Sequence, residues 1–468
     1  MRRSLTNKIR LLAAASLILI VVVSAITVIL LQQRTTETTI NVTPERSQFI
    51  TEYSTGSTTS APNAIAVDAN GDVWFALQNQ TSLGEFIPSN DTTHVFQLPE
   101  PRSEGIVTWG IAIDNSKGLA WFTDQTANAV WSFNVNTHIF HEYHLKTPNA
   151  FPFDLVLDQN GNVWFTELFG NKIGEVTALG KLYEIAIPST GDPEPSGIAT
   201  QGSNVWFALP GIESVASYSS GNFKFYDLSQ LIDCPQDTCP VAITADPQGN
   251  LWMTFHGPNL ISEFNPTSHY FRTISTSVPA LGTSLPYFIE TTQEGDVWFN
   301  EHYGNAMALF EPMNNTLVEY ETPTRLEFAG NISGMLTMGL SDSGTPWFTE
   351  FFSGKIGTVN TTVPLSANLD VLNYSTISET PITIANHSQI SLKLSIHNFS
   401  SSSLTLEGAS GNLTGNFSFS FAPDSISGSA ASIATIHNNG SKPGVYFLTL
   451  SAKTSNLIVS KIVEITVP

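Results

Sequence analysis

The sequence of 468 residues predicts an all-β protein: a seven-bladed β-propeller followed by an immunoglobulin-like β-sandwich, with one N-terminal transmembrane helix. A Trp-Phe motif, once Trp-Met, recurs seven times at a spacing of 42 to 49 residues, and a period in the forties with strand-like content is typical of propellers. Short runs of β-forming residues between turns rich in Gly, Asn, Asp and Pro indicate strands rather than helices. The motif centres on Trp74, Trp121, Trp164, Trp206, Trp252, Trp298 and Trp347.

The N-terminus predicts a membrane anchor. Residues 1–10 contain four basic residues, and residues 11–31 contain no charged residue. At ~1.5 Å per residue this stretch can span a ~30 Å hydrocarbon layer, whereas a cleaved signal peptide, the alternative, has a shorter apolar core. The basic residues predict a cytoplasmic N-terminus and an extracytoplasmic remainder, as in a single-pass protein of the cell membrane. Residues 32–46, rich in Thr and Gln without periodicity, are expected to form a stalk.

Residues 47–364 are expected to form the propeller. Each repeat contains four short strands, and four strands in each of seven repeats fit a closed ring of blades. The last repeat ends near residue 359 without a fourth strand, whereas residues 48–54 resemble the fourth strands of other repeats. We therefore predict that residues 48–54 complete the last blade and join the two ends of the ring.

Residues 365–468 predict a second all-β domain. The tryptophans stop, and apolar and polar residues alternate in segments such as 391–396, 417–421 and 445–450. This alternation is typical of strands with one buried face. An immunoglobulin-like sandwich is the most economical interpretation, although the segment lacks the Cys-Trp-Cys pattern of true immunoglobulin domains.

The charge and the glycosylation motifs bear on the partners and the compartment. A formal net charge of −21, with only 19 Lys and Arg, disfavours nucleic acid and anionic lipid headgroups as partners. Asn-X-Ser/Thr motifs beyond the anchor predict a glycoprotein exposed outside the cell. They lie at Asn41, Asn79, Asn90, Asn314, Asn331, Asn360, Asn373, Asn386, Asn398, Asn412, Asn416 and Asn439.

The two cysteines of the sequence, Cys234 and Cys239, are expected to form a local disulfide. Disulfides persist in extracytoplasmic compartments, and no other Cys is available to either residue. Free or metal-bound thiols remain the alternative.

The repeat resembles a known family. Its opening Gly110-Ile111-Ala112, its central strand at 162–167 (Asn-Val-Trp-Phe-Thr-Glu) and its continuation at 170–174 (Gly-Asn-Lys-Ile-Gly) are similar to repeats of the virginiamycin B lyases, also called streptogramin lyases. The similarity covers about two thirds of the chain. It implies a propeller and a Mg²⁺-dependent elimination that opens cyclic depsipeptide antibiotics at an ester C–O bond.

The resemblance also implies positions for the catalytic groups, which in the family are two histidines and two glutamates. The histidine positions fall on Tyr287 and Ser333, and the glutamate positions fall on Asn331 and Glu350. Ser and Asn do not act as unaided bases at neutral pH, and Tyr titrates near pH ~10. These substitutions argue against the family's elimination reaction in this chain.

Acidic residues end the tryptophan strand in four repeats. These residues are Asp124, Glu167, Glu301 and Glu350. Because the corresponding strand ends meet around the axis of a propeller, they could converge on a hard cation such as Mg²⁺ or Ca²⁺, with Glu350 and Glu301 as tentative ligands. The alternative is that the carboxylates only solvate loop ends. With Ser333 and Asn331, they define the expected binding face.

Two histidines follow the same strand ends in adjacent repeats. His256 and His302 could form a relocated acid/base pair, with Tyr287 polarising a carbonyl and Glu350 assisting. The alternative is that each histidine is an ordinary polar residue.

Two function classes follow from these observations. The first hypothesis is a membrane-anchored surface protein, without catalytic activity, that binds a small molecule, glycan or protein on the propeller face. The second is a Mg²⁺-dependent carbon–oxygen lyase, or a lactone hydrolase, that acts on a cyclic ester.

Overall fold

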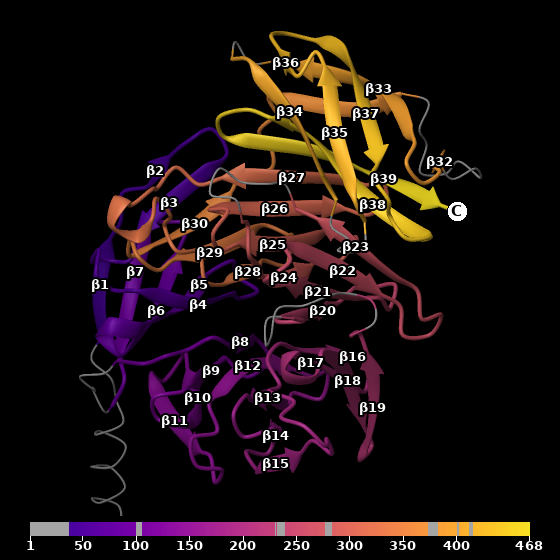
Figure 1. The fold of residues 1–468 in the computed structure, drawn as a ribbon. Coiled ribbons are helices and arrows are strands. Elements are labelled where there is room, and N and C mark those ends of the chain that lie inside the picture. Colours follow the sequence, from indigo (N-terminus) through magenta and orange to yellow (C-terminus); the bar gives the residue numbers. More distant parts are fainter. Residues whose placement is uncertain are drawn as a thin grey trace, which may run out of the picture.

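The computed structural model describes residues 37–99, 105–229, 231, 239–276, 283–372, 382–399, 402–410 and 415–468. These residues form an all-β protein without an α-helix (Figure 1). Three short 3-10 helices interrupt the strands, η1 (Gln78–Gln80), η2 (Pro210–Ile212) and η3 (Glu327–Ala329). The expected anchor at 11–31 lies outside the described residues. Within them, no helix has the length and apolarity needed to cross a bilayer.

Each of the seven repeats forms an antiparallel sheet of four strands. The first four sheets are β4 (Pro62–Val67), β5 (Val73–Leu77), β6 (Ser82–Ile87) and β7 (Thr92–Gln97); β8 (Ile111–Asp114), β9 (Leu119–Asp124), β10 (Ala129–Asn134) and β11 (Ile139–His144); β12 (Pro152–Leu157), β13 (Val163–Glu167), β14 (Lys172–Val176) and β15 (Leu182–Ala186); and β16 (Ile198–Gln201), β17 (Asn204–Leu209), β18 (Ser214–Ser219) and β19 (Asn222–Asp227).

The other three sheets continue the series. They are β20 (Ile243–Ala245), β21 (Leu251–Phe255), β22 (Leu260–Phe264) and β23 (Phe271–Ser275); β24 (Pro286–Thr291), β25 (Val297–Glu301), β26 (Ala306–Glu311) and β27 (Thr316–Glu321); and β28 (Met338–Leu340), β29 (Pro346–Glu350), β30 (Lys355–Val359) and β3 (Ile50–Ser54). We call the sheets blades 1 to 7 in this order.

The first strands of the blades contact one another around a closed circle. The contacts run from β4 through β8, β12, β16, β20, β24 and β28, and β28 returns to β4. This is the arrangement of a β-propeller. The ring closes as the sequence predicts, because β3 pairs with β30 from Ile50 opposite Val359 to Ser54 opposite Lys355.

The repeated residues explain why the blades stack. The motif tryptophans are buried between blades, and none of the seven is more than 8% exposed. Hydroxyl groups on the second strand of a blade reach the next blade: Thr123 donates to Phe153 O, Thr166 to Ser196 O and Thr254 to Tyr287 O, at 2.6–3.0 Å. The core therefore lies between the blades, and the axis is left for a channel.

The segment expected to be a stalk is partly built into the propeller. Residues 37–41 form β1 (Glu37–Asn41), which pairs with β7 and adds a fifth strand to blade 1. Residues 45–46 form β2 (Glu45–Arg46), which pairs with β3. The stalk prediction is wrong for these residues, because the open edges of β7 and β3 pair with an extended segment that has no strand periodicity of its own.

The C-terminal region is all-β, as predicted, and contains two sheets that share one hydrophobic core. One sheet runs in the order β31 (Ala367–Leu372), β33 (Gln389–Asn398), β37 (Ala430–Asn438) and β35 (Phe417–Ala422). The other contains β39 (Leu457–Val467), β38 (Gly444–Lys453), β34 (Leu404–Ser410) and β36 (Ser425–Ile426), and β32 (Ile382–Thr383) pairs with β39.

The second of these sheets is continuous with blade 6. Strand β39 pairs with β27 from Thr316 opposite Lys461 to Tyr320 opposite Leu457, so blade 6 and the C-terminal strands form one nine-stranded sheet (Figure 1). Val318 and Tyr320 of the propeller belong to the same hydrophobic cluster as Val459 of the C-terminal region. The two regions are therefore joined by a main-chain ladder and a shared core.

Candidate functional site

Irregular inner strands shape the channel mouth. The pairing of β12 with β13 shifts register between Pro152 and Leu155, and the pairing of β24 with β25 shifts between Pro286 and Ile289. Such bulges redirect side chains and are common beside functional sites. Here the shifted residues include Phe153 in blade 3 and Tyr287 in blade 6.

The mouth brings together the two histidines and the tyrosine that the sequence singles out. The rings of His256 and Tyr287 lie 5.3 Å apart between centroids, those of His256 and His302 6.2 Å, and those of Tyr287 and His302 6.0 Å. The predicted juxtaposition across blades 5 and 6 is therefore present. Trp109 extends the cluster, with its ring 5.6 Å from Tyr287 and 5.6 Å from Phe153. We call these five residues the mouth cluster.

Burial sets the protonation of the mouth cluster. It lowers the pKa of His256 to about 4, and His302 nearby contributes to the same shift. Burial also lowers the pKa of His302, although the bond between its Nδ1 and Met335 O, at 3.0 Å, opposes this shift. The pKa of Tyr287 is raised by burial and by Asp154. At neutral pH the cluster thus offers two uncharged imidazoles and one phenol that can donate a hydrogen bond.

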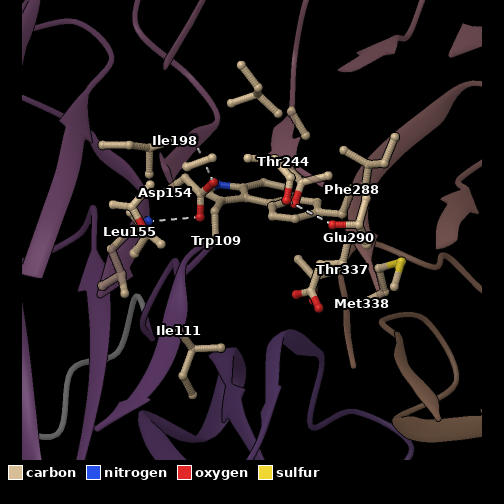
Figure 2. A pocket seen from close by; sticks show the side chains of 18 of the residues that line it. Trp109, Ile111, Asp154, Leu155, Ile198, Thr244, Phe288, Glu290, Thr337 and Met338 are labelled. Carbon is tan, nitrogen blue, oxygen red and sulfur yellow. Dashed lines mark hydrogen bonds between the residues drawn. The ribbon is translucent and has the colours of Figure 1, made fainter. Parts of the chain in front are cut away.

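A cavity of about 280 Å³ lies along the axis and is lined by the first strands of the blades (Figure 2). Trp109 belongs to the mouth cluster and also lines this cavity, so it connects the two. Two carboxyl groups point into the cavity, Asp154 from β12 and Glu290 from β24. Asp154 accepts bonds from the backbone N–H groups of Leu155 (2.8 Å) and Ile198 (3.2 Å).

Both carboxyl groups are shifted toward neutrality. Burial raises the pKa of Asp154 to about 7, against the effect of its two backbone hydrogen bonds. Burial and the nearby Asp154 raise the pKa of Glu290 to about 7, against a bond of 2.9 Å from the N–H of Leu340 to Oε2. Sequence reasoning missed both residues. The setting Pro152-Phe153-Asp154-Leu155, which parallels Pro286-Tyr287-Phe288-Ile289, is the signal that could have found Asp154.

Glu290→Gln is expected to stabilise the protein at pH 8 and not at pH 5. The folded-state pKa is above the unfolded value, so ionisation opposes folding progressively as pH rises from about 4.5 to about 7, and the penalty is complete above that range. Removing the charge should raise the free energy of unfolding by ~1–2 kcal/mol at pH 8. Thermal and urea unfolding at both pH values would measure the difference.

The control is Glu327→Gln, in the exposed helix η3, which should leave stability unchanged at both pH values. A Glu290→Gln protein that gains nothing at pH 8 would show that burial does not oppose ionisation of this carboxyl group.

The acidic residues at the strand ends do not converge on the axis. Asp124, Glu167, Glu301 and Glu350 are all at most 1% exposed. Glu167 and Glu301 are packed beneath the turn glycines Gly170 and Gly304 of their own blades. They lie inside the hairpins, because main-chain turns fold over them, and so they neither solvate loop ends nor form a common face.

The carboxyl groups nearest to three of these strand-end acids come from the same blade as the acid itself. Glu301 shares a hydrogen bond with Glu319 on the outer strand, and burial together with this carboxyl raises its pKa. Burial and the charge of Glu52 raise the pKa of Glu350 to about 8, although Ser353 donates a 3.0 Å bond to its Oε2. Burial and the charge of Glu184 raise the pKa of Glu167 to about 7.

The other residues of the expected binding face do not belong to the mouth cluster. Ser333 is fully buried, and its Oγ donates to Asn305 Oδ1 at 2.9 Å. Asn331 is exposed in the left-handed region of backbone space, with φ of 66°, and its carbonyl accepts a bond from Arg325. Of the four positions that the resemblance implies, only Tyr287 lies in the mouth cluster.

Neither tentative metal ligand belongs to the metal-like cluster of the structure. Among the described residues, the one group of three or more His, Cys, Asp or Glu with atoms close enough to share an ion is Asp68 and Asp72, in the turn between β4 and β5, with Glu85 of β6. Asp68 accepts bonds from Asn70 N, Asp72 N and Trp74 Nε1. The same turn recurs in blades 3 and 5, where Asn162 and Asn250 replace Asp72 and donate to the turn aspartates Asp158 and Asp246, which indicates a structural role. Cys239 is disulfide-bonded, and Cys234 lies outside the described residues.

Comparisons with known proteins agree with the repeat pattern. Residues 33–218 match the model of the virginiamycin B lyase family. The propeller is therefore similar to those of the virginiamycin B lyase family. A streptogramin B lyase structure is similar at 26% identity and a TM-score of 0.57, covering 66% of this chain and 97% of that protein. No curated protein sequence matches the chain.

Two further solved structures share the fold. A catalytically inactive histidine-to-alanine variant of virginiamycin B lyase from Staphylococcus aureus, with quinupristin, is 24% identical, with a TM-score of 0.57 over 66% of this chain and 98% of that protein. The extracellular domain of a putative one-component system from B. thetaiotaomicron is 13% identical, with a TM-score of 0.50. That match covers 91% of this chain and 59% of the other protein, so it includes much of the C-terminal β region.

Proposed function

We propose that this protein, whose propeller resembles the virginiamycin B lyases, is a binding protein anchored on the outer side of the cell membrane, and that the mouth cluster holds its ligand. The observation that supports this proposal is the convergence of His256, His302 and Tyr287 beside the rings of Trp109 and Phe153. Uncharged imidazoles and a phenol can donate and accept hydrogen bonds, and the indole provides an apolar wall.

The rim of the mouth supports a ligand with apolar or ring-shaped groups. Strands β13, β25 and β29 end at the same end of the propeller, and an exposed aromatic residue lies two positions after each of them: Phe169, Tyr303 and Phe352. Phe169 packs on Phe151 with ring centroids 4.6 Å apart. Exposed aromatic residues around a concave site are typical of binding surfaces. Cyclic peptides, lactones and glycans with apolar faces fit these features.

The residues at the family's catalytic positions support binding rather than elimination. Ser333 and Asn331 have no basic side chain, and Glu350 is enclosed in the hairpin of blade 7. A base, an electrophile and an acid must all reach one substrate for this reaction. The catalytic groups that the family's reaction requires are therefore missing at these positions.

A relocated lyase is the second candidate function. His256 and His302 are uncharged at neutral pH, and an uncharged imidazole can remove a proton next to a carbonyl group. Their ring centroids are 6.2 Å apart, so both could reach one bound ester. Tyr287 could then donate to the developing enolate oxygen. Lactone hydrolysis would use the same residues with a water molecule.

Incubation of the full chain with quinupristin and MgCl₂ separates these functions. We expect the ring to stay closed and the intrinsic tryptophan fluorescence of the chain to change on binding, because Trp109 lies in the mouth cluster. Elimination would open the ring without a change in mass, and hydrolysis would add the mass of one water. A metal-dependent ring opening at constant mass would contradict the binding proposal and support the relocated lyase.

Variants of the mouth cluster test whether the ligand binds there. The double variant His256→Ala/His302→Ala should weaken ligand binding by at least about tenfold, because central contacts of a site carry most of the binding free energy. The matched control His397→Ala lies on β33, far along the chain from the mouth cluster, and should bind normally. Equal binding by both variants would place the ligand elsewhere.

We also propose that residues 11–31 anchor the chain in the membrane and that the extracytoplasmic Asn-X-Ser/Thr motifs are glycosylated. Both proposals follow from the sequence patterns above. The C-terminal region, as an immunoglobulin-like sandwich, would act as a spacer or adhesion module beside blade 6.

A further inference from the structure

We propose that the axial cavity is a second binding site, which takes a small organic cation: a protonated amine attached to an apolar group. This site lies behind Trp109 and goes beyond the proposed function of the mouth cluster. Its wall combines two carboxyl groups, two aromatic side chains and several aliphatic side chains.

The two carboxyl groups face the cavity from opposite sides. Asp154 belongs to blade 3 and Glu290 to blade 6, three blades apart in a ring of seven, and Figure 2 shows them on either side of the space. Oε2 of Glu290 accepts the N–H of Leu340, whereas Oε1 has no hydrogen-bond partner among the described residues. An ammonium group would supply the donors that this oxygen lacks.

The described wall of the cavity has no positively charged side chain to pair with the two carboxyl groups. Where the structure describes the lining of the cavity, it contains no Lys, Arg or His side chain. The hydroxyls of Thr200 and Thr291 donate to carbonyls of neighbouring strands, Leu157 O at 3.2 Å and Ala245 O at 3.0 Å, so they are already engaged. Buried carboxylates without a cation are unfavourable, and a bound cation would remove this penalty.

The remaining wall suits the apolar part of the ligand. Trp109 borders the cavity at its mouth side, and an indole face attracts an ammonium or its adjacent methylene groups. Phe288 of β24 adds a second aromatic ring, and the half-buried Ile111 of β8 also lines the cavity. The other isoleucines of the lining pack into the hydrophobic clusters between the blades: Ile65, Ile198, Ile243 and Ile289.

A divalent metal ion fits the cavity less well than an amine. Ca²⁺ takes six to eight oxygen ligands, and Mg²⁺ requires an octahedral set. Asp154 and Glu290 approach from opposite walls and are not part of the one metal-like group found among the described residues. Two separated carboxylates beside the rings of Trp109 and Phe288 match an elongated organic cation instead.

Titration of the full chain with benzylamine at pH 8, followed by calorimetry, tests the proposal. Benzylamine stays protonated at this pH, and both carboxyl groups are then mostly ionised. Benzyl alcohol, the uncharged analogue of the same shape, should bind at least about tenfold more weakly, because a charge-assisted bond is replaced by a neutral one. Equal binding of amine and alcohol would overturn the proposal without any need for a variant.

Variants locate the bound amine. Glu290→Gln and Asp154→Asn should each weaken benzylamine binding about tenfold or more, whereas Glu327→Gln should not change it. Unchanged binding by folded Glu290→Gln and Asp154→Asn proteins would overturn the proposal. So would binding of CaCl₂ at these residues while benzylamine gives no signal. The variant His256→Ala/His302→Ala should keep its affinity for benzylamine, so a failure of the mouth site and a failure of the cavity site give different results.

Discussion

A chain that begins at residue 55 is expected to lose the cooperative unfolding transition of the propeller. Strand β3 is the fourth strand of blade 7, and its removal leaves the edge of β30 unpaired. The same segment carries Phe49 and Ile50, which are at most 2% exposed. Circular dichroism and calorimetry should show a broad transition or an aggregated protein in place of one sharp transition.

A chain that begins at residue 37 is the matched control, since it keeps β1, β2 and β3, and it should unfold cooperatively. A point variant gives a graded version of the test. Tyr53 packs against Phe86 and Trp347 with ring centroids 4.5 and 5.6 Å away, so Tyr53→Ala should cost ~2–4 kcal/mol of unfolding free energy. If the chain from residue 55 unfolds as sharply as the control, the ring does not depend on this strand.

Val459→Lys is expected to destabilise the propeller and the C-terminal region together. Val459 is fully buried and pairs with Val318 of β27, where the sheet of blade 6 continues into β39. A buried, unpaired ammonium at this position should lower the free energy of unfolding by ~3 kcal/mol or more. Because the two regions share a core, we expect one transition at a lower temperature in calorimetry, not two.

Val445→Lys provides the control for this substitution. Val445 lies on the neighbouring strand β38 and is 48% exposed, so the same change should shift stability by no more than ~0.5 kcal/mol. Two separate transitions in the wild-type chain, with only one moved by Val459→Lys, would show that the domains fold independently despite the continuous sheet.

Much of the propeller could be predicted from local sequence patterns. The repeated tryptophan strand and the Gly-Asn turn define each blade, because strand periodicity and turn chemistry are properties of neighbouring residues. The closing strand at 50–54 was also predictable, since its pattern matches the outer strands of other blades. The grouping of His256, His302 and Tyr287 followed from equivalent places in the repeat.

The structure was needed wherever a property depends on residues distant in the sequence. The strand-end acids were expected at the mouth, but turns such as the one at Gly304 fold over them. The motif at 152–155 marks the position of Asp154, but the shifted pKa values of Asp154 and Glu290 arise only when the ring encloses both side chains. No sequence pattern marks this enclosure.

The sequence by itself determined the number of repeats, the order of strands within each blade and the segment that closes the ring, because these depend on spacing and on side chains a few residues apart. The tertiary structure alone decided that β1 extends blade 1 and that β39 joins blade 6. An edge strand can pair with any extended segment that reaches it, because the pairing uses main-chain hydrogen bonds. The side chains therefore do not reveal which segment will pair with which edge.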